Sequence, residues 1–131
     1  MSNIVTSVKA VIYTKDKFLL LEAPKGVRDL PGGRIEYGEE AESALKRELI
    51  EELDFDISQY SPNLHYVWTY TSDSKQIHQI LIVYSIFLLT ERTFIHMEEM
   101  ETECKWIDKY SITHKQFLPQ MEKLLLHIFN L

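Results

Sequence analysis

The stretch of chain from residue 32 to residue 55 gathers acidic side chains at spacings typical of a helix. Four charged residues fall within two turns of it: Arg47, Glu48, Glu51 and Glu52. At about 100° per residue, Glu48 and Glu52 fall at the edge of the apolar stripe that contains Leu49. Carboxylates held together and partly out of water repel one another, so they either take up protons or recruit cations. A hard divalent ion, Mg²⁺ or Mn²⁺, is the natural neutraliser of oxygen ligands, and the sequence therefore predicts a metal site.

The negative charge of the chain is concentrated in the same region. The net charge is −6, and residues 34–56 alone carry nine acids against three bases, which accounts for all of it. The remainder is balanced, so no basic stripe for extended DNA or RNA binding is predicted. An acidic site still accepts a phosphate substrate when metal ions lie between the two.

Bulk properties predict one soluble domain over residues 1–131, with a core of ordinary size. The longest apolar run, residues 80–89, is too short to span a membrane and is typical of a buried strand. The first ten residues lack the layout of a signal peptide. A single cysteine, Cys104, excludes an internal disulfide and any site that needs several cysteines. Cytoplasmic residence is the resulting expectation.

The acidic helix is expected at residues 41–53, with strands and loops around it. Strands are predicted at 4–14, 18–21, 64–71, 77–89 and 105–107. Residues 23–30 are predicted as a loop, 31–33 as a turn that brings the backbone close to a ligand, and 98–103 as an acidic loop. A second helix is predicted from about residue 114, on the spacing of Phe117, Met121, Leu124, Leu125 and Ile128. Strands with helices between them indicate an α/β or α+β sandwich.

The spacing of the fixed residues resembles the Nudix box, G-x5-E-x7-R-E-U-x-E-E-x-G-U, where U is a bulky aliphatic residue. Five residues separate Gly33 from Glu39, and seven separate Glu39 from Arg47. Glu48, Glu51 and Glu52 follow in the required order. The box spans 23 residues, and the flanking strands and C-terminal helix also lie where the family has them. Two positions depart from the pattern: Asp54 replaces the final glycine, and Phe55 is aromatic where an aliphatic is usual.

The resemblance implies an α/β/α sandwich around a mixed sheet, with the box as a loop-helix-loop. It also implies hydrolysis of a nucleoside diphosphate linked to another group, with Mg²⁺ or Mn²⁺ required. Glu48, Glu51 and Glu52 would be metal ligands, joined by the backbone carbonyl near Gly32. Glu39 and Arg47 would orient these carboxylates.

A further acid from the downstream loop is also implied, as an extra ligand or as the general base; Glu52 is the other candidate for the base. The candidates are Glu98, Glu99, Glu101 and Glu103, of which Glu98 and Glu101 are favoured. Gly33 is expected to contact the substrate. Arg28, Tyr37 and Tyr70 are expected to contact it as well, with packing or solvent exposure as the alternative. Arg28 stands where relatives often have an aromatic.

Several residue patterns carry simpler interpretations. Tyr66, Trp68 and Tyr70 alternate on one strand face and are expected to pack on the sheet, with stacking on a base as the less favoured alternative. The five histidines show no paired metal spacing and are expected at the surface or as satisfied core residues. Cys104 is expected to pack rather than to act as a nucleophile.

The first substrate expectation is an ordinary or oxidised nucleoside triphosphate, cleaved to monophosphate and pyrophosphate. Dinucleoside polyphosphates and nucleotide sugars such as ADP-ribose stay open; Tyr70 stands where ADP-ribose enzymes often have proline. RNA cap removal is disfavoured by the lack of a basic surface. The alternative from another class is a non-catalytic nucleotide sensor, against which the presence of every box glutamate argues. A homodimer through the apolar residues 124–131 is also open.

Overall fold

The computed structural model describes residues 3–114 and 119–131. The strands are β1 (Asn3–Tyr13), β2 (Lys17–Glu22), β3 (Arg28–Asp29), β4 (Gly32–Arg34), β5 (Asn63–Ser72), β6 (Ile77–Phe87) and β7 (Glu103–Asp108). The helices are α1 (Ala41–Leu53) and α2 (Pro119–Ile128), with two short 3-10 helices at Pro24–Gly26 and Lys109–His114. Neither α-helix in this described part has the length and apolar character needed to cross a membrane.

The strands form one mixed sheet, in the order β3-β2-β1-β6-β5, with β4 paired to β1 and β7 paired to β2. The central β1 runs parallel to β6 over its whole length and antiparallel to its other two partners, β2 and β4. Strand β1 contacts β2, β4, β6 and α1. It therefore fixes where the glycine strand β4 and the acidic helix α1 lie.

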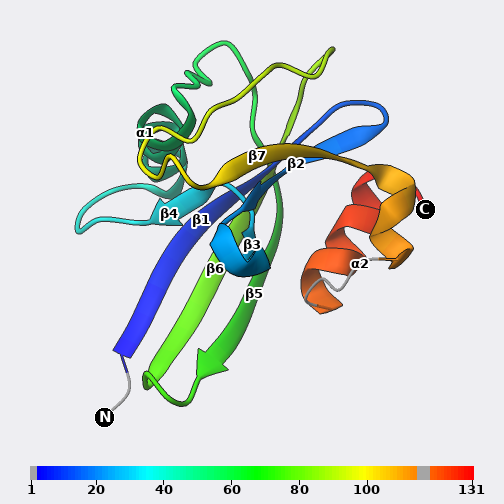
Figure 1. Ribbon diagram of the computed structural model, residues 1–131. Coiled ribbons are helices and arrows are strands. Elements are labelled where there is room, and N and C mark those ends of the chain that lie inside the picture. Colours follow the sequence, from blue (N-terminus) through cyan, green and yellow to red (C-terminus); the bar gives the residue numbers. More distant parts are fainter. Residues whose placement is uncertain (1–2, 115–118) are drawn as a thin grey trace.

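Helices cover both faces of the sheet (Figure 1). Side chains alternate along β1, so Val8 and Ala10 pack in the cluster that contains Leu45 and Leu49 of α1. Val11 points to the opposite face, where it packs in the cluster with Leu124 and Leu125 of α2. The predicted sandwich around a mixed sheet is confirmed.

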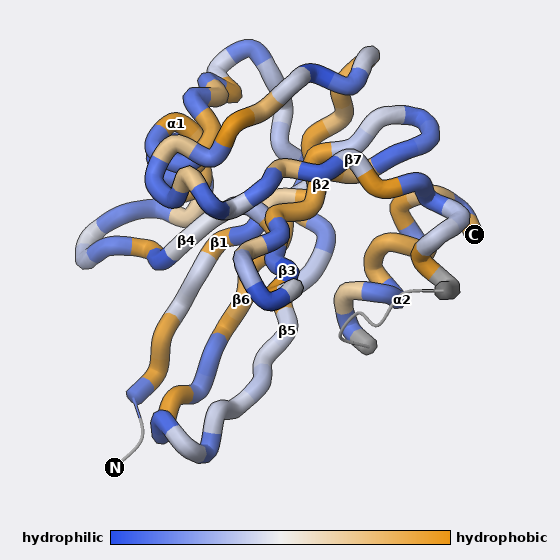
Figure 2. The backbone as a smooth tube through the Cα atoms, viewed as in Figure 1, coloured by the Kyte–Doolittle hydropathy of each residue, from blue (hydrophilic) through white to orange (hydrophobic). Residues whose placement is uncertain are grey.

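Both helices are amphipathic, as their positions over the sheet require. Figure 2 shows hydrophobic and hydrophilic turns in α1 and in α2. The buried residues of α1 are Ala44, Leu45, Leu49 and Leu53, which is the apolar stripe that the sequence predicted. The residues that would begin the predicted second helix, Phe117 among them, lie outside the described residues.

Two sequence predictions at the loop before α1 were incomplete. Residues 23–30 were expected as a loop, yet Arg28–Asp29 pairs with β2 as strand β3. Residues 31–33 were expected as a turn, yet Gly32–Arg34 forms β4 against Ser7–Lys9 of β1. Both short strands depend on partners distant in sequence, which local turn signals do not reveal.

The C-terminal end of α1 is made by Asp54, the residue that replaces glycine in the box. Its backbone is left-handed, with φ 52° and ψ 38°. Its N–H donates to the Ile50 carbonyl at 3.0 Å, and the Phe55 N–H donates to the Leu49 carbonyl at 3.1 Å. Asp therefore takes the conformation that glycine adopts more cheaply at a helix end.

We expect Asp54→Gly to raise the free energy of unfolding by about 1 kcal/mol, because glycine meets no steric penalty at positive φ. Asp54→Ala serves as the matched comparison and should be less stable than Asp54→Gly. Urea denaturation measures both. Equal stability of the glycine and alanine variants would show that the left-handed backbone carries no cost.

Candidate active site

Glu48 and Glu52 lie against the two glycines of β4. Glu52 Oε1 accepts a hydrogen bond from the Gly32 N–H at 2.9 Å. A Cβ on Gly33 would lie 2.3 Å from Glu48 Cδ, so the missing side chain makes room for this carboxylate. The glycine-to-glutamate spacing of the sequence thus corresponds to direct contact between β4 and α1.

Burial separates the three clustered glutamates. The side chains of Glu48 and Glu52 are only 15% and 13% exposed, as their place at the edge of the apolar stripe predicted. Glu51 is 47% exposed. Burial raises the pKa of Glu52, while the hydrogen bond from Gly32 opposes that rise.

Arg47 holds the acidic residues together. Its guanidinium binds Glu39 with two hydrogen bonds, Nε to Oε2 at 2.9 Å and Nη2 to Oε1 at 3.0 Å. Nη1 donates to Glu48 Oε1 at 2.9 Å and to Glu51 Oε2 at 3.3 Å. Nη2 also donates to the Arg34 carbonyl at 3.0 Å, which ties the loop before α1 to the helix. One cation therefore compensates several anions in a charge-assisted network.

Glu39 is the carboxylate most strongly bound in this network. Hydrogen bonds from Arg47 and from the Glu36 N–H lower the pKa of Glu39 to about 2. The hydrogen bond to Glu39 raises the pKa of Arg47, and the hydrogen bond to Glu48 raises it by a smaller amount. The pair consequently stays ionised at any pH at which the protein works.

A cleft of about 380 Å³ opens beside Glu52. Its lining residues are Leu21, Ala23, Val27, Asp29, Glu52, His96, Glu98, Glu99 and Thr102. Glu98 and Glu99 thus lie in the cleft, whereas Glu101 and Glu103 are not among its lining residues. Glu99 accepts a hydrogen bond from the Thr102 hydroxyl at 3.1 Å, and Glu103 lies 3.5 Å from Lys105.

His96 is a site residue that the sequence pattern does not reveal. His96 is 5% exposed, and its Nε2 lies 3.4 Å from Glu52 Oε2. Nothing local marks this histidine, because its partner stands 44 positions earlier in the chain. The run of acidic residues that begins at Glu98 was the sequence signal that the loop containing His96 faces the site.

The residues expected to contact substrate are spread around the site. Arg28 Nε donates to Glu22 Oε1 at 3.0 Å, so it is engaged with a protein carboxylate. Tyr37 is fully exposed in the loop before α1, and Tyr70 is partly exposed on β5. Gly33 alone contacts a box glutamate directly.

Cys104 lies in the core cluster that contains α1. Burial, with the Glu52 carboxylate as a smaller contribution, raises the pKa of the Cys104 thiol to about 11. This agrees with packing rather than nucleophilic chemistry.

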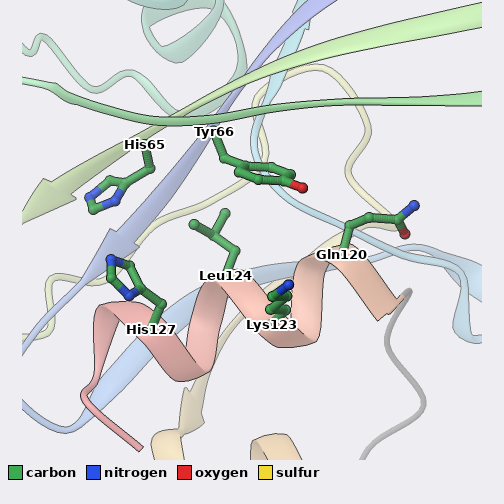
Figure 3. Close-up of a pocket in the computed structure, with 6 residues that line it drawn as sticks. All are labelled: His65, Tyr66, Gln120, Lys123, Leu124 and His127. Atoms are coloured by element: carbon green, nitrogen blue, oxygen red, sulfur yellow. The ribbon is translucent and has the colours of Figure 1, made fainter.

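A second, smaller cavity of about 210 Å³ lies between β5 and α2. Figure 3 shows His65 and Tyr66 of the strand pointing toward Lys123, Leu124 and His127 of the helix. A bulge between Leu64 and Tyr66 shifts the register of β5 here, so neighbouring side chains reach the same face. No carboxylate is among the described residues that line this cavity, so it is not a place for a hard cation.

The carboxylates of the acidic helix are suitable ligands for a divalent cation, but two of them are hydrogen-bonded to Arg47 instead. Carboxylate and carbonyl oxygens are the ligands that Mg²⁺ and Mn²⁺ prefer. Within residues 3–114 and 119–131, no three His, Cys, Asp or Glu side chains are gathered closely enough to hold an ion. Glu48 and Glu51 point to Arg47 and would have to turn from it to bind a metal.

The protein is an α+β sandwich in which the acidic helix α1 contacts the two glycines of β4 and borders a cleft. The family model described as NUDIX domain matches residues 4–128. The chain therefore belongs to the Nudix family and is a hydrolase of phosphoanhydride bonds. A search of curated proteins found no match.

Solved structures share this fold at low sequence identity. The MutT protein from Methanosarcina mazei Go1 is 22% identical, with a TM-score of 0.76, over 98% of this chain and 94% of that one. The E. coli dihydroneopterin triphosphate pyrophosphohydrolase is 19% identical, with a TM-score of 0.79, over 95% and 94%. The C. elegans Ap4A hydrolase, as a binary complex, is 23% identical, with a TM-score of 0.75, over 95% and 94%.

The two glycines of β4 should respond differently to alanine. In Gly32→Ala the new Cβ would lie 2.0 Å from the Val8 carbonyl oxygen, at a φ of +143°, so the backbone itself must shift. We expect a loss of about 2 kcal/mol or more in the free energy of unfolding. Gly33→Ala displaces only the end of the Glu48 side chain and should lose much less. Thermal denaturation of the two variants tests this order, and a reversed order would contradict the contacts.

The Glu39–Arg47 pair should make stability depend on pH in acid. The pKa of Glu39 is about 2 in the fold against an ordinary 4.5, so its contribution is complete above pH 4.5 and is lost as pH falls toward 2. We expect Glu39→Gln to be less stable than wild type at pH 7, with the difference shrinking between pH 4.5 and 2. Urea denaturation at a series of pH values measures this difference. A difference that stays constant over that range would show that the ion pair does not contribute.

Proposed function

We propose that this Nudix hydrolase is a pyrophosphohydrolase of a small nucleotide and depends on Mg²⁺ or Mn²⁺. The observation that carries the proposal is the charge of the cleft beside Glu52. Its lining contains four carboxylates, from Asp29, Glu52, Glu98 and Glu99, and no Lys or Arg among the described residues. A polyphosphate would be repelled from this surface unless divalent cations lay between the two.

The ligands proposed for the cation are the side chains of Glu48, Glu51 and Glu52 and the backbone carbonyl of Gly32. Glu98 is the acid proposed to join them from the loop, because it lies in the cleft with Glu52 and Glu101 does not. A bound divalent ion neutralises phosphate charge and makes water more acidic, which is the chemistry that hydrolysis of a phosphoanhydride requires.

The chain's own residues have separate tasks in this proposal. The Arg47–Glu39 pair ties the acidic helix to the preceding loop. Arg47 also binds the carboxylate of Glu48, where a divalent cation would replace it. Glu52, the most buried of the three, or Glu98 would accept the proton of the attacking water. Water attacks phosphorus, the P–O–P bridge breaks, and a monophosphate and a pyrophosphate leave.

A nucleoside triphosphate is the first substrate proposed. Relatives of the fold carry names that include a dihydroneopterin triphosphate pyrophosphohydrolase and an Ap4A hydrolase, so dinucleoside polyphosphates belong in the same screen. Nucleotide sugars such as ADP-ribose belong there as well. Arg28, Gly33, Tyr37 and Tyr70 are the residues proposed to contact the substrate.

The proposed contact at Tyr70 has a specific support in the sheet. Tyr70 pairs with Gln79 across β5 and β6, and Trp68 is the next side chain on the same face. Trp68 Nε1 and Gln79 Oε1 are buried and have no hydrogen-bond partner among the residues that the structure describes. An unpartnered donor and an unpartnered acceptor on one face suit the polar edge of a nucleobase.

A nucleotide panel with Mg²⁺ or Mn²⁺, read as phosphate released after added pyrophosphatase, tests the function. We expect hydrolysis of at least one nucleotide and its loss when the metal is chelated. Glu52→Gln should lower kcat by about 100-fold or more while the protein stays folded. Glu42→Gln removes the same charge from an exposed position of the same helix and is the matched control.

The result also separates an enzyme from a sensor. Tight nucleotide binding with no turnover across the panel would favour a non-catalytic sensor and contradict the proposal. Unchanged turnover in Glu52→Gln would contradict the role given to that carboxylate.

A further inference from the structure

His96 is held in one orientation between its own loop and the acidic helix. Its Nδ1 accepts a hydrogen bond from the Glu99 N–H at 2.9 Å. Because Nδ1 is an acceptor, the proton of the neutral imidazole lies on Nε2. That nitrogen lies 3.4 Å from Glu52 Oε2, so the ring presents a donor to the carboxylate.

The same loop also binds the backbone of Glu52. The Met97 N–H donates to the Glu52 carbonyl at 2.8 Å, one of the carbonyls that the end of α1 leaves without a helical partner. The side chain of Glu52 is bound from two sides, with Oε1 on the Gly32 N–H and Oε2 beside His96. Strand β4, helix α1 and the loop after β6 therefore meet at one carboxylate.

We propose that His96 is a positioning residue for Glu52. Its Nε2 fixes the rotation of the carboxylate, while the hydrogen bond from the Glu99 N–H holds the ring itself in place. The inference rests on the proposed function, because it assigns His96 to the orientation of a proposed metal ligand. Partners of this kind typically contribute 10–100-fold to metal affinity or activity.

Two substitutions separate this role from simple core packing. His96→Asn keeps an acceptor near the place of Nδ1 for the Glu99 N–H but is too short to reach Glu52. His96→Gln extends a donor to about the place of Nε2 and keeps the contact with Glu52. A packing role predicts comparable losses in both variants, whereas the positioning role predicts rescue by Gln alone.

The measurement is the dissociation constant of Mn²⁺ alone, by electron paramagnetic resonance, for wild type, His96→Asn and His96→Gln. We expect the constant to rise about 10-fold or more in His96→Asn and to stay within about threefold of wild type in His96→Gln. With the nucleotide found in the panel, kcat should follow the same order while KM changes little. His127→Asn, an exposed histidine of α2, is the matched control.

Each outcome has a distinct meaning. Wild-type affinity and kcat in His96→Asn, or equal losses in both variants with a lower melting temperature, would overturn the positioning role and leave the proposed function standing. A wild-type protein that neither binds Mn²⁺ nor hydrolyses any nucleotide would overturn the proposed function, and the role of His96 with it.

Discussion

The close approach of α1 to β4 is the constraint on which the site depends. Gly33 has no side chain, so the carboxylate of Glu48 reaches the backbone of the strand, and the Gly32 N–H binds Glu52. Gly32 itself lies so close to β1 that any Cβ on it would touch the Val8 carbonyl oxygen. A larger side chain at position 33 would displace the Glu48 carboxylate from this place. The leucines of the helix supply the packing that holds it there, and the glycines determine how near it comes.

That approach creates an electrostatic problem, which Arg47 relieves. Burial of adjacent carboxylates is unfavourable, and a single guanidinium bound to Glu39, Glu48 and Glu51 offsets much of it. The compensation is weaker at Glu52, whose side chain is bound by a backbone amide and lies beside a histidine, with Lys9 acting on it through its charge without an ion-pair contact. A ligand that brings positive charge therefore gains most at Glu52, on the wall of the cleft.

The sequence predicted the local parts of this arrangement and missed those that depend on distant partners. The bounds of α1 and the left-handed Asp54 follow from helical spacing and from the steric rules of a helix end, which need only neighbouring residues. Strand β4 was expected as a turn because its partner, Ser7–Lys9, lies more than twenty positions away. His96 was expected at the surface or in the core for the same reason, since one histidine carries no spacing to read. No spacing rule separates Glu98 from Glu101, because which of them lines the cleft depends on the path of the loop.

Four positive charges near the cleft are engaged with carboxylates, and this limits how an anion can be held there. Lys9 lies 2.8 Å from Asp29, and Arg47 is paired with four glutamates, Glu36, Glu39, Glu48 and Glu51. Arg28 and Lys105 both contact Glu22, whose pKa they lower, Lys105 more than Arg28. A phosphate that recruited Lys9 or Arg47 would draw that cation from the carboxylates it now balances, which costs about as much as the new contact returns. A divalent cation brings its own positive charge to the cleft, although Glu48 and Glu51 must turn from Arg47 to bind it. The acidic lining and the paired bases therefore both favour a substrate that arrives with its counter-ions, which is the electrostatic basis of the proposed cation dependence.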